Sequence, residues 1–180
     1  MSHIVYKPSE ARLVFGDVFA GCGGLSLGLI NAGWKGLFAI EQNANAFETL
    51  KTNLLSDQQK GFDWPQWLPA TPMDATCFIN RYGSHLSDLK GKLDLLAGGP
   101  PCQGFSMAGR RIHADPRNAL TEEYIRIIQK LEPRLLLIEN VQGFTLSFKK
   151  NGNGKEITLD AVQKKLESIG IIINLERLMK

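Results

Sequence analysis

The sequence predicts an α/β domain with a mostly parallel sheet, helices on both faces and right-handed crossovers. Short apolar runs, each long enough for one buried strand, alternate with longer segments whose apolar residues recur at helical spacing. Two of the apolar runs stop at glycine-rich turns, as strands do where an open α/β sheet binds a ligand. The 180 residues are enough for one domain with a sizeable core.

Composition narrows the class of protein. Hydrophobic residues make up 43% and charged residues 22%, which is ordinary for a globular chain, and the net charge of +3 is compatible with nucleic acid without being diagnostic. The three cysteines have neither metal-ligand spacing nor a disulfide framework, so we expect no metal. No membrane span or signal peptide is recognisable. We expect a bacterial cytoplasmic or nucleoid-associated protein.

The first elements surround a glycine turn. Residues 1–12 are a loose lead-in, and 13–20 form an apolar strand that ends at Gly21-Cys22-Gly23-Gly24. A helix follows and stops at Gly33. Strand, glycine turn and helix together place backbone N–H groups and a helix N-terminus against a nucleotide-like ligand.

A second strand over 37–40 ends on Glu41, about 20 residues beyond the glycine turn, where dinucleotide-binding folds keep the acid that binds ribose. A helix with apolar residues at 47, 50 and 54 follows. We expect an irregular loop over 56–69, with Trp64 and Trp67 in a local apolar cluster, and a short strand over 70–73 that delivers Asp74 to the sheet edge.

The second half continues the alternation, with helices expected over 84–89, 120–131 and 159–169 and strands over 93–97, 134–138 and 171–178. The 134–138 run is apolar almost throughout, which is typical of a strand buried on both faces. Between 107 and 117 the chain is basic and rich in turns, which suits a flap that touches phosphates or simply a solvated loop.

Four chemically active residues follow four different strands: Glu41, Asp74, Cys102 and Glu139. The carboxyl ends of parallel strands share one edge, so these residues should line one crevice. Each carboxylate alone is more often a helix cap than a ligand contact. Cys102 alone is either a small buried hydrophobe or a nucleophile aimed by the stiff Pro100-Pro101 pair.

The full strings favour the functional interpretation. Gly-Gly-Pro-Pro-Cys-Gln-Gly-Phe-Ser at 98–106, Asp-Val-Phe-Ala-Gly-Cys-Gly-Gly-Leu at 17–25 and Glu-Asn-Val at 139–141 resemble three motifs of the DNA (cytosine-5) methyltransferases. The resemblance runs from about Leu13 to Met179. It implies a Rossmann-like fold that binds S-adenosylmethionine (SAM).

The same resemblance assigns roles to individual residues. Cys102 corresponds to the nucleophile and Glu139 to the carboxylate that faces the cytosine, while Glu41 would bind the ribose and Asp74 the adenine amino group. The implied cofactor contacts are Phe19, Gly21, Gly23, Gly24, Leu25, Glu41, Asp74 and Pro100. The implied DNA contacts are Ser106, Arg110, Arg111 and Asn140.

The chemistry explains these residue types. Cytosine C5 is a poor nucleophile until a thiolate adds at C6, so Cys102 has to ionise, helped by N–H donors or by guanidinium groups such as those of Arg110 and Arg111. Glu139 would give or share a proton at N3, after which C5 accepts the methyl group of SAM. The target base has to be flipped out of the duplex to reach these groups.

The family pattern is incomplete at the C-terminus. No Gln-x-Arg-x-Arg motif occurs, and no target-recognition domain follows, so 13–180 corresponds to part of a catalytic domain. A fragment, one half of a split enzyme and a degenerate product all remain possible. We expect double-stranded DNA as substrate, little activity from the isolated chain, and a complementing C-terminal polypeptide or self-association through an exposed strand at 171–178.

Three other functions fit parts of the sequence pattern. An NAD-dependent oxidoreductase fits the glycine turn and Glu41 but not Ser26, which stands where the dinucleotide pattern has its third glycine. A non-catalytic SAM-binding subunit would keep the glycine motif and leave Cys102 idle. Methylation of cytosine in RNA shares the same fold, and the ending Gly104-Phe105-Ser106 looks more like the DNA branch.

Overall fold

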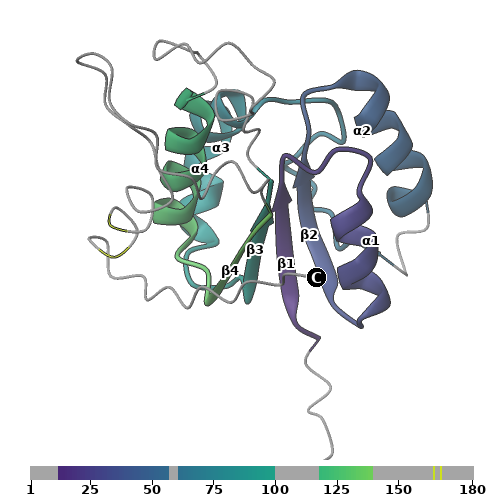
Figure 1. Ribbon diagram of the computed structural model, residues 1–180, viewed down its shortest axis with the longest axis horizontal. Helices are drawn as coiled ribbons and strands as arrows, with labels where there is room; N and C mark the ends of the chain where they lie inside the picture. The colour runs from purple at the N-terminus through teal and green to yellow at the C-terminus, as the bar shows by residue number, and fades with distance from the viewer. Residues whose placement is uncertain (1–11, 57–60, 100–117, 140–163, 165–166, 168–180) are drawn as a thin grey trace, which may run out of the picture.

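The computed structural model describes residues 12–56, 61–99 and 118–139, together with Lys164 and Glu167 (Figure 1). Within these residues the chain forms a four-stranded, wholly parallel sheet in the order β2-β1-β3-β4, which confirms the predicted fold class. Helices α1 and α2 lie on one side of the sheet, and α3 and α4 on the other (Figure 1). The elements are β1 Val14–Val18, α1 Gly24–Asn31, β2 Lys35–Ile40, α2 Ala44–Leu50, a π-helical turn η1 Lys51–Leu55, α3 Ala75–Asp88, β3 Leu95–Gly98, α4 Asn118–Leu131 and β4 Leu135–Ile138.

The strand order places a topological switch point between β1 and β3. The chain runs from β1 through α1 to β2 on one side of β1, and then crosses by α3 to β3 on its other side. Open α/β sheets bind their ligands outside the carboxyl ends of the strands at such a point. The tips of β1 and β3 are therefore where a site is expected.

Two apolar clusters hold the layers together. Between the sheet and α3 and α4, the fully buried side chains include Phe38, Phe78 and Leu96. Beneath α1 and α2 a smaller cluster contains Phe15 and Leu50. Each such side chain contributes about 1.5–3 kcal/mol on burial, so most of the stabilisation comes from these two layers.

Two predicted elements differ from the structure. The short helix expected over 84–89 is the last part of the longer α3, which departs from helical geometry at Tyr82, before Gly83. Residues 70–73 form no strand, because Pro72 cannot donate to a sheet ladder. The Met73 N–H still donates to the Glu41 carbonyl at 2.8 Å and brings Asp74 to the sheet edge.

The prediction that both faces of the 134–138 strand are buried is wrong. Leu135 is 56% exposed and Leu137 36% exposed, whereas Leu136 and Ile138 pack against the α3 and α4 side of the core. Among the described residues β4 is the last strand, and no described helix covers its other face. A continuous apolar run therefore indicates a strand with two covered faces only when the covering elements are present.

The segment after η1 lies along β2. Gly36 and Phe62 form an isolated parallel bridge, with Gly36 donating to the Gly61 carbonyl and Asp63 donating to that of Gly36. Trp64 packs on Phe62, and Trp67 stacks on His85 of α3 with ring centroids 4.6 Å apart. The local apolar arrangement expected for the two tryptophans is confirmed.

Several predictions lie outside the described residues. These concern Pro100, Cys102, Ser106, Arg110, Arg111, Asn140 and the strand at 171–178. Of the helix predicted over 159–169, Lys164 and Glu167 are described, and both are helical and exposed. No helix in the described part of the chain is long and apolar enough to cross a membrane.

Candidate cofactor and active site

The tip of β1 turns sharply through left-handed backbone. Phe19, Gly21 and Gly23 have φ angles of 64°, 56° and 86°. Glycine adopts this conformation freely, but a residue with a side chain such as Phe19 is strained by about 1–2 kcal/mol. Strain of this kind persists where the surrounding contacts over-determine it, and it concentrates at functional sites.

Glu41 connects the glycine turn to the tip of β2. Its Oε2 accepts from the Gly21 N–H at 2.9 Å, and its Oε1 accepts from the Asn43 N–H at 2.7 Å. The sequence predicts Glu41 and the glycine turn at one edge of the sheet, and the structure brings Glu41 and Gly21 into direct contact. Each carboxylate oxygen retains a second lone pair, so Glu41 can also accept from the hydroxyl groups of a ligand.

The turn forms an open cradle on the outside. A Cβ atom added at Gly21 or Gly24 would meet nothing within 4 Å, whereas one added at Gly23 would lie 2.8 Å from Leu54 Cδ1. The first turn of α1 has no side-chain cap at Gly23 and no acidic residue, and its Ser26 N–H donates to Asp17. The N–H groups before Ser26 and the positive dipole end are therefore available to an anionic ligand group. A nucleoside with a carboxylate tail fits this donor set.

Asp17 is a buried member of the site for which no separate role was predicted. It is 1% exposed, and its Oδ2 accepts from Ser26 Oγ at 2.7 Å, which ties β1 to the first turn of α1. Burial raises the pKa of Asp17 to about 6, helped by the negative charge of Glu41 and opposed by the hydrogen bonds from Ser26. The sequence signal was a charged residue inside an otherwise apolar strand.

Asp74 serves as the N-cap of α3. Its Oδ1 accepts from the Cys77 N–H at 2.6 Å. The capping bond matches the alternative interpretation given above, and the contact of Asp74 with the adenine amino group stays a prediction. Because one oxygen serves the cap, the carboxylate still has acceptor capacity toward a ligand.

Glu139 lies at the tip of β4, beside the tip of β3. Its N–H donates to the Gly98 carbonyl at 2.9 Å. Its exposed carboxylate lies over Gly99, because a Cβ atom added there would be 2.9 Å from Glu139 Oε2. Gly99 precedes Cys102 by three residues in the sequence. The structure thus brings Glu139 to the start of the cysteine segment.

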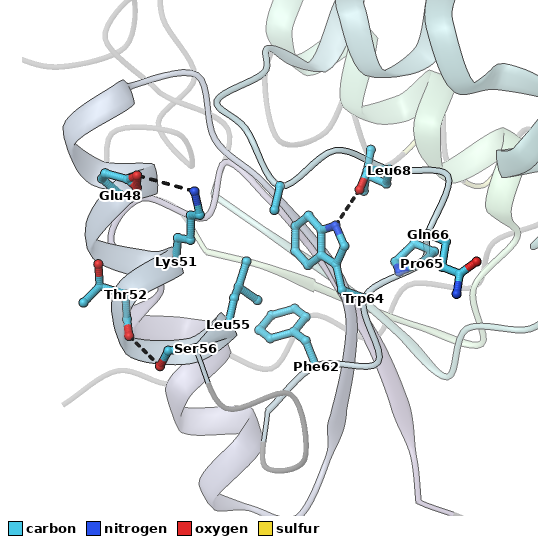
Figure 2. A pocket seen from close by; sticks show the side chains of 11 residues that line it. Glu48, Lys51, Thr52, Leu55, Ser56, Phe62, Trp64, Pro65, Gln66 and Leu68 are labelled. Atoms are coloured by element: carbon cyan, nitrogen blue, oxygen red, sulfur yellow. Dashed lines mark hydrogen bonds and ion pairs between the residues drawn. The ribbon is translucent and has the colours of Figure 1, made fainter.

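A separate pocket of about 670 Å³ lies between α2, η1 and the 62–70 segment (Figure 2). Leu55, Phe62 and Trp64 form its apolar part, and the Trp64 indole donates to the Leu68 carbonyl at 2.7 Å. Neither Gly21, Glu41 nor Glu139 lines it. The strand tips, rather than this pocket, therefore define the candidate site.

The fold and the site together define a class. The parallel sheet carries a glycine turn after β1 and a carboxylate after β2 that holds this turn, with further acidic residues at the tip of β4 and at the start of α3. This arrangement defines an α/β protein that binds a nucleoside-containing cofactor at its switch point. The family follows from sequence comparison. The model of the family described as C-5 cytosine-specific DNA methylase matches residues 13–176, and the chain belongs to this family.

Individual relatives agree with this assignment. The chain is 32% identical over 154 residues to the type II methyltransferase M.DdeI of Desulfomicrobium norvegicum, covering 86% of this chain and 33% of that protein. It is 35% identical to M.PspPI of a Psychrobacter species, covering 86% of this chain and 32% of that protein. The chain thus spans about a third of the length of these relatives.

A solved structure supports the fold. The crystal structure of a candidate DNA modification methyltransferase encoded within an E. coli prophage superposes with a TM-score of 0.60 at 27% identity. The match covers 88% of this chain and 38% of the crystallised chain. The matched part therefore makes up less than half of that crystallised chain.

Proposed function

We propose that this chain is the cofactor-binding and catalytic part of a SAM-dependent enzyme that methylates C5 of cytosine in double-stranded DNA, as in type II modification systems. The observation that carries the proposal is the convergence of the strand tips. The Glu41-held glycine turn lies at the tip of β1, and Glu139 lies over the residue that leads to Cys102. Family membership supplies the reaction class.

The residues of the β1 and β2 tips would hold the cofactor. When bound, SAM supplies a methyl group on a sulfonium. The backbone of Gly21, Gly23, Gly24 and Leu25 would contact its amino-acid part, and Glu41 would accept from the ribose hydroxyls. Phe19, Pro100 and Asp74 would border the adenine, with Asp74 accepting from its amino group.

Cys102 and Glu139 would activate the cytosine. The Cys102 thiolate forms a bond to C6, and Glu139 shares a proton with N3, so that C5 becomes enamine-like and takes the methyl group. A base then removes the C5 proton, the electron pair restores the C5–C6 double bond, and Cys102 leaves as a thiolate. We propose Ser106, Arg110, Arg111 and Asn140 as contacts to the flipped nucleotide and its phosphates.

The match covers about a third of the length of these relatives, and reading a DNA sequence needs groove contacts in addition to those with the flipped nucleotide. We therefore propose that turnover requires a complementing C-terminal polypeptide, and that the protein acts in the bacterial cytoplasm, where DNA and SAM are present together.

Calorimetric titration with SAM tests the cofactor site without requiring turnover. The wild-type chain should bind SAM, and Glu41→Ala should weaken binding by at least about tenfold, because the loss of a charge-assisted hydrogen bond costs about 1.5–3 kcal/mol. Glu48→Ala on α2 is the matched control, since the Glu48 side chain is exposed and its Oε1 lies 3.6 Å from Lys51 Nζ in a surface ion pair. Absence of SAM binding by the wild type would overturn the proposal.

Covalent trapping tests the catalytic residues. In the presence of SAM, a duplex that contains 5-fluorocytosine should form a stable adduct with the wild-type chain when the remaining part of M.DdeI is supplied as the complementing polypeptide, because fluorine replaces the C5 proton whose removal would release Cys102. Cys102→Ser should form none. SAM binding without any adduct in DNA would identify a non-catalytic SAM-binding subunit. An adduct with fluorocytosine RNA alone would identify an RNA enzyme.

A further inference from the structure

Tyr124 of α4 is the largest of the buried polar side chains near the candidate site. It is 2% exposed and points from α4 toward the sheet, where it belongs to the core cluster on that side. Its ring meets the ring of Phe19 edge to face, with centroids 6.0 Å apart and planes inclined at 61°. Its hydroxyl is 3.5 Å from the Leu96 carbonyl, a long contact to β3.

The same ring touches the tip of β3. A Cβ atom added at Gly98 would lie 2.8 Å from Tyr124 Cε2 and 2.9 Å from the Val18 carbonyl. Glycine at position 98 therefore allows β1, β3 and Tyr124 to approach one another closely. The ring fills the space between the two strand tips on either side of the switch point.

The two tips that Tyr124 contacts have different tasks in the proposed reaction. Phe19 belongs to the turn that holds the cofactor, and its left-handed backbone has to be maintained by packing. Gly98 is the last residue of β3, and Cys102 follows it four residues later in the sequence. Burial, together with the negative charge of Asp17, raises the pKa of Tyr124 far above its usual range, so the phenol remains neutral at this junction.

We propose that Tyr124 is a positioning residue that holds Phe19 and the Gly98 tip in register, so that the shape of the cofactor turn, and with it the affinity for SAM, depends on this aromatic ring. This inference rests on the proposed function, because it assigns the two contacted tips to SAM and to the nucleophile. It adds a residue on α4, outside all three motifs, to the machinery of the reaction.

Two substitutions separate the ring from the hydroxyl. Tyr124→Phe keeps the edge-to-face contact and removes only a long hydrogen bond, so SAM affinity should change by less than about twofold. Tyr124→Leu removes the aromatic pair, and SAM affinity should fall about tenfold, which is the factor that corresponds to losing one such pair. Tyr124→Met, which fills similar volume, replaces Tyr124→Leu if that variant does not fold, with the same expected loss.

Ile127→Ala is the control for general destabilisation, because Ile127 of α4 is as buried as Tyr124 and belongs to the same apolar cluster. It should lower the melting temperature and leave SAM affinity unchanged.

The outcomes separate the inference from the proposed function. If the wild type binds SAM and Tyr124→Leu, or Tyr124→Met in its place, binds equally well, the positioning role is refuted while the proposed function stands. Equal losses in Ile127→Ala and Tyr124→Leu would also refute it, because the effect would then be one of general stability. If the wild type does not bind SAM, the proposed function fails and the inference fails with it.

Discussion

The tips of β1 and β4 differ in how completely the described residues support them. At the tip of β1, Asp17 is buried and bonded to Ser26, Gly21 is bonded to Glu41, and Phe19 packs on Tyr124. At the tip of β4, the Glu139 side chain is exposed, and two leucines of the strand face outward on the side opposite α4. The half of the candidate site that is proposed to bind the cofactor is thus held in place by contacts among the described residues.

We infer from this difference that the two halves of the proposed site would depend to different degrees on a complementing polypeptide. A turn with its hydrogen bonds in place can bind a ligand without rearrangement. A strand with an exposed apolar face has yet to gain a packing partner. We therefore expect substitutions at the β1 tip to change cofactor affinity in the chain alone, and those at β4 to matter chiefly when a partner is present.

The largest expected effect is a difference in the free energy of unfolding between a buried position on β3 and an exposed one on β4. Leu96→Ala, at a fully buried position on β3, should lower the free energy of unfolding by about 2–5 kcal/mol. Leu135→Ala on β4 should lower it by less than about 1 kcal/mol, because the side chain is already half exposed. Urea denaturation measures both. Equal losses would show that the outer face of β4 is covered in solution.

A pH-dependent effect of nearly this size is expected at Asp17. The pKa of this carboxyl rises from 3.8 to about 6 on folding, so folding favours the protonated form. The stability that this shift contributes is present below the unfolded pKa and is lost as the pH rises through the folded one. Relative to Asp17→Asn, the wild type should therefore lose up to about 3 kcal/mol over this window.

Urea titrations of both proteins at several pH values between about 4 and 7 measure this difference. Ser26→Ala provides a second comparison, because it removes a hydrogen bond that opposes the rise of the pKa. Parallel pH profiles for wild type and Asp17→Asn would mean that Asp17 does not titrate in this range.

A smaller effect is expected from the glycine turn. Gly23→Ala puts a side chain at a φ of 86° with its Cβ 2.8 Å from Leu54, which should cost about 1–3 kcal/mol of stability and weaken SAM binding. Gly28→Ala, in α1 with open space around the added Cβ, should be neutral or stabilising by up to about 1 kcal/mol. Thermal melts measure the stability of the two variants, and calorimetry measures their SAM affinity. Similar values for both variants would show that glycine is not specifically required at position 23.

The smallest stability effect is expected at Glu139. Its carboxylate is exposed, so Glu139→Gln should change the free energy of unfolding by no more than about 0.5 kcal/mol and leave SAM affinity unaltered. The same variant should form the fluorocytosine adduct more slowly in the complemented enzyme. A loss of SAM affinity would instead place Glu139 within the cofactor half.

Much of the fold and of the cofactor turn could be predicted from the sequence, because the signals on which they depend are local. An apolar run, a glycine turn and an acid at the proper distance predict β1, α1 and the position of Glu41 at the sheet edge, since each depends on neighbouring residues and on the shared edge of parallel strands. Tyr124 could not be assigned in this way, because its partners are distant in sequence and its spacing is that of any core residue. The exposure of Leu135 was missed for the same reason: it depends on which element covers the strand.

The bridge between Gly36 and Phe62 makes the two margins of the sheet unlike. The segment around Phe62 occupies hydrogen-bonding groups on the outer side of Gly36 at the start of β2, whereas β4 has no neighbour beyond it among the described strands. Backbone pairing is thus capped at one margin and available at the other. Any strand recruited during assembly would be added next to Glu139, and the enlargement of this sheet would be directional.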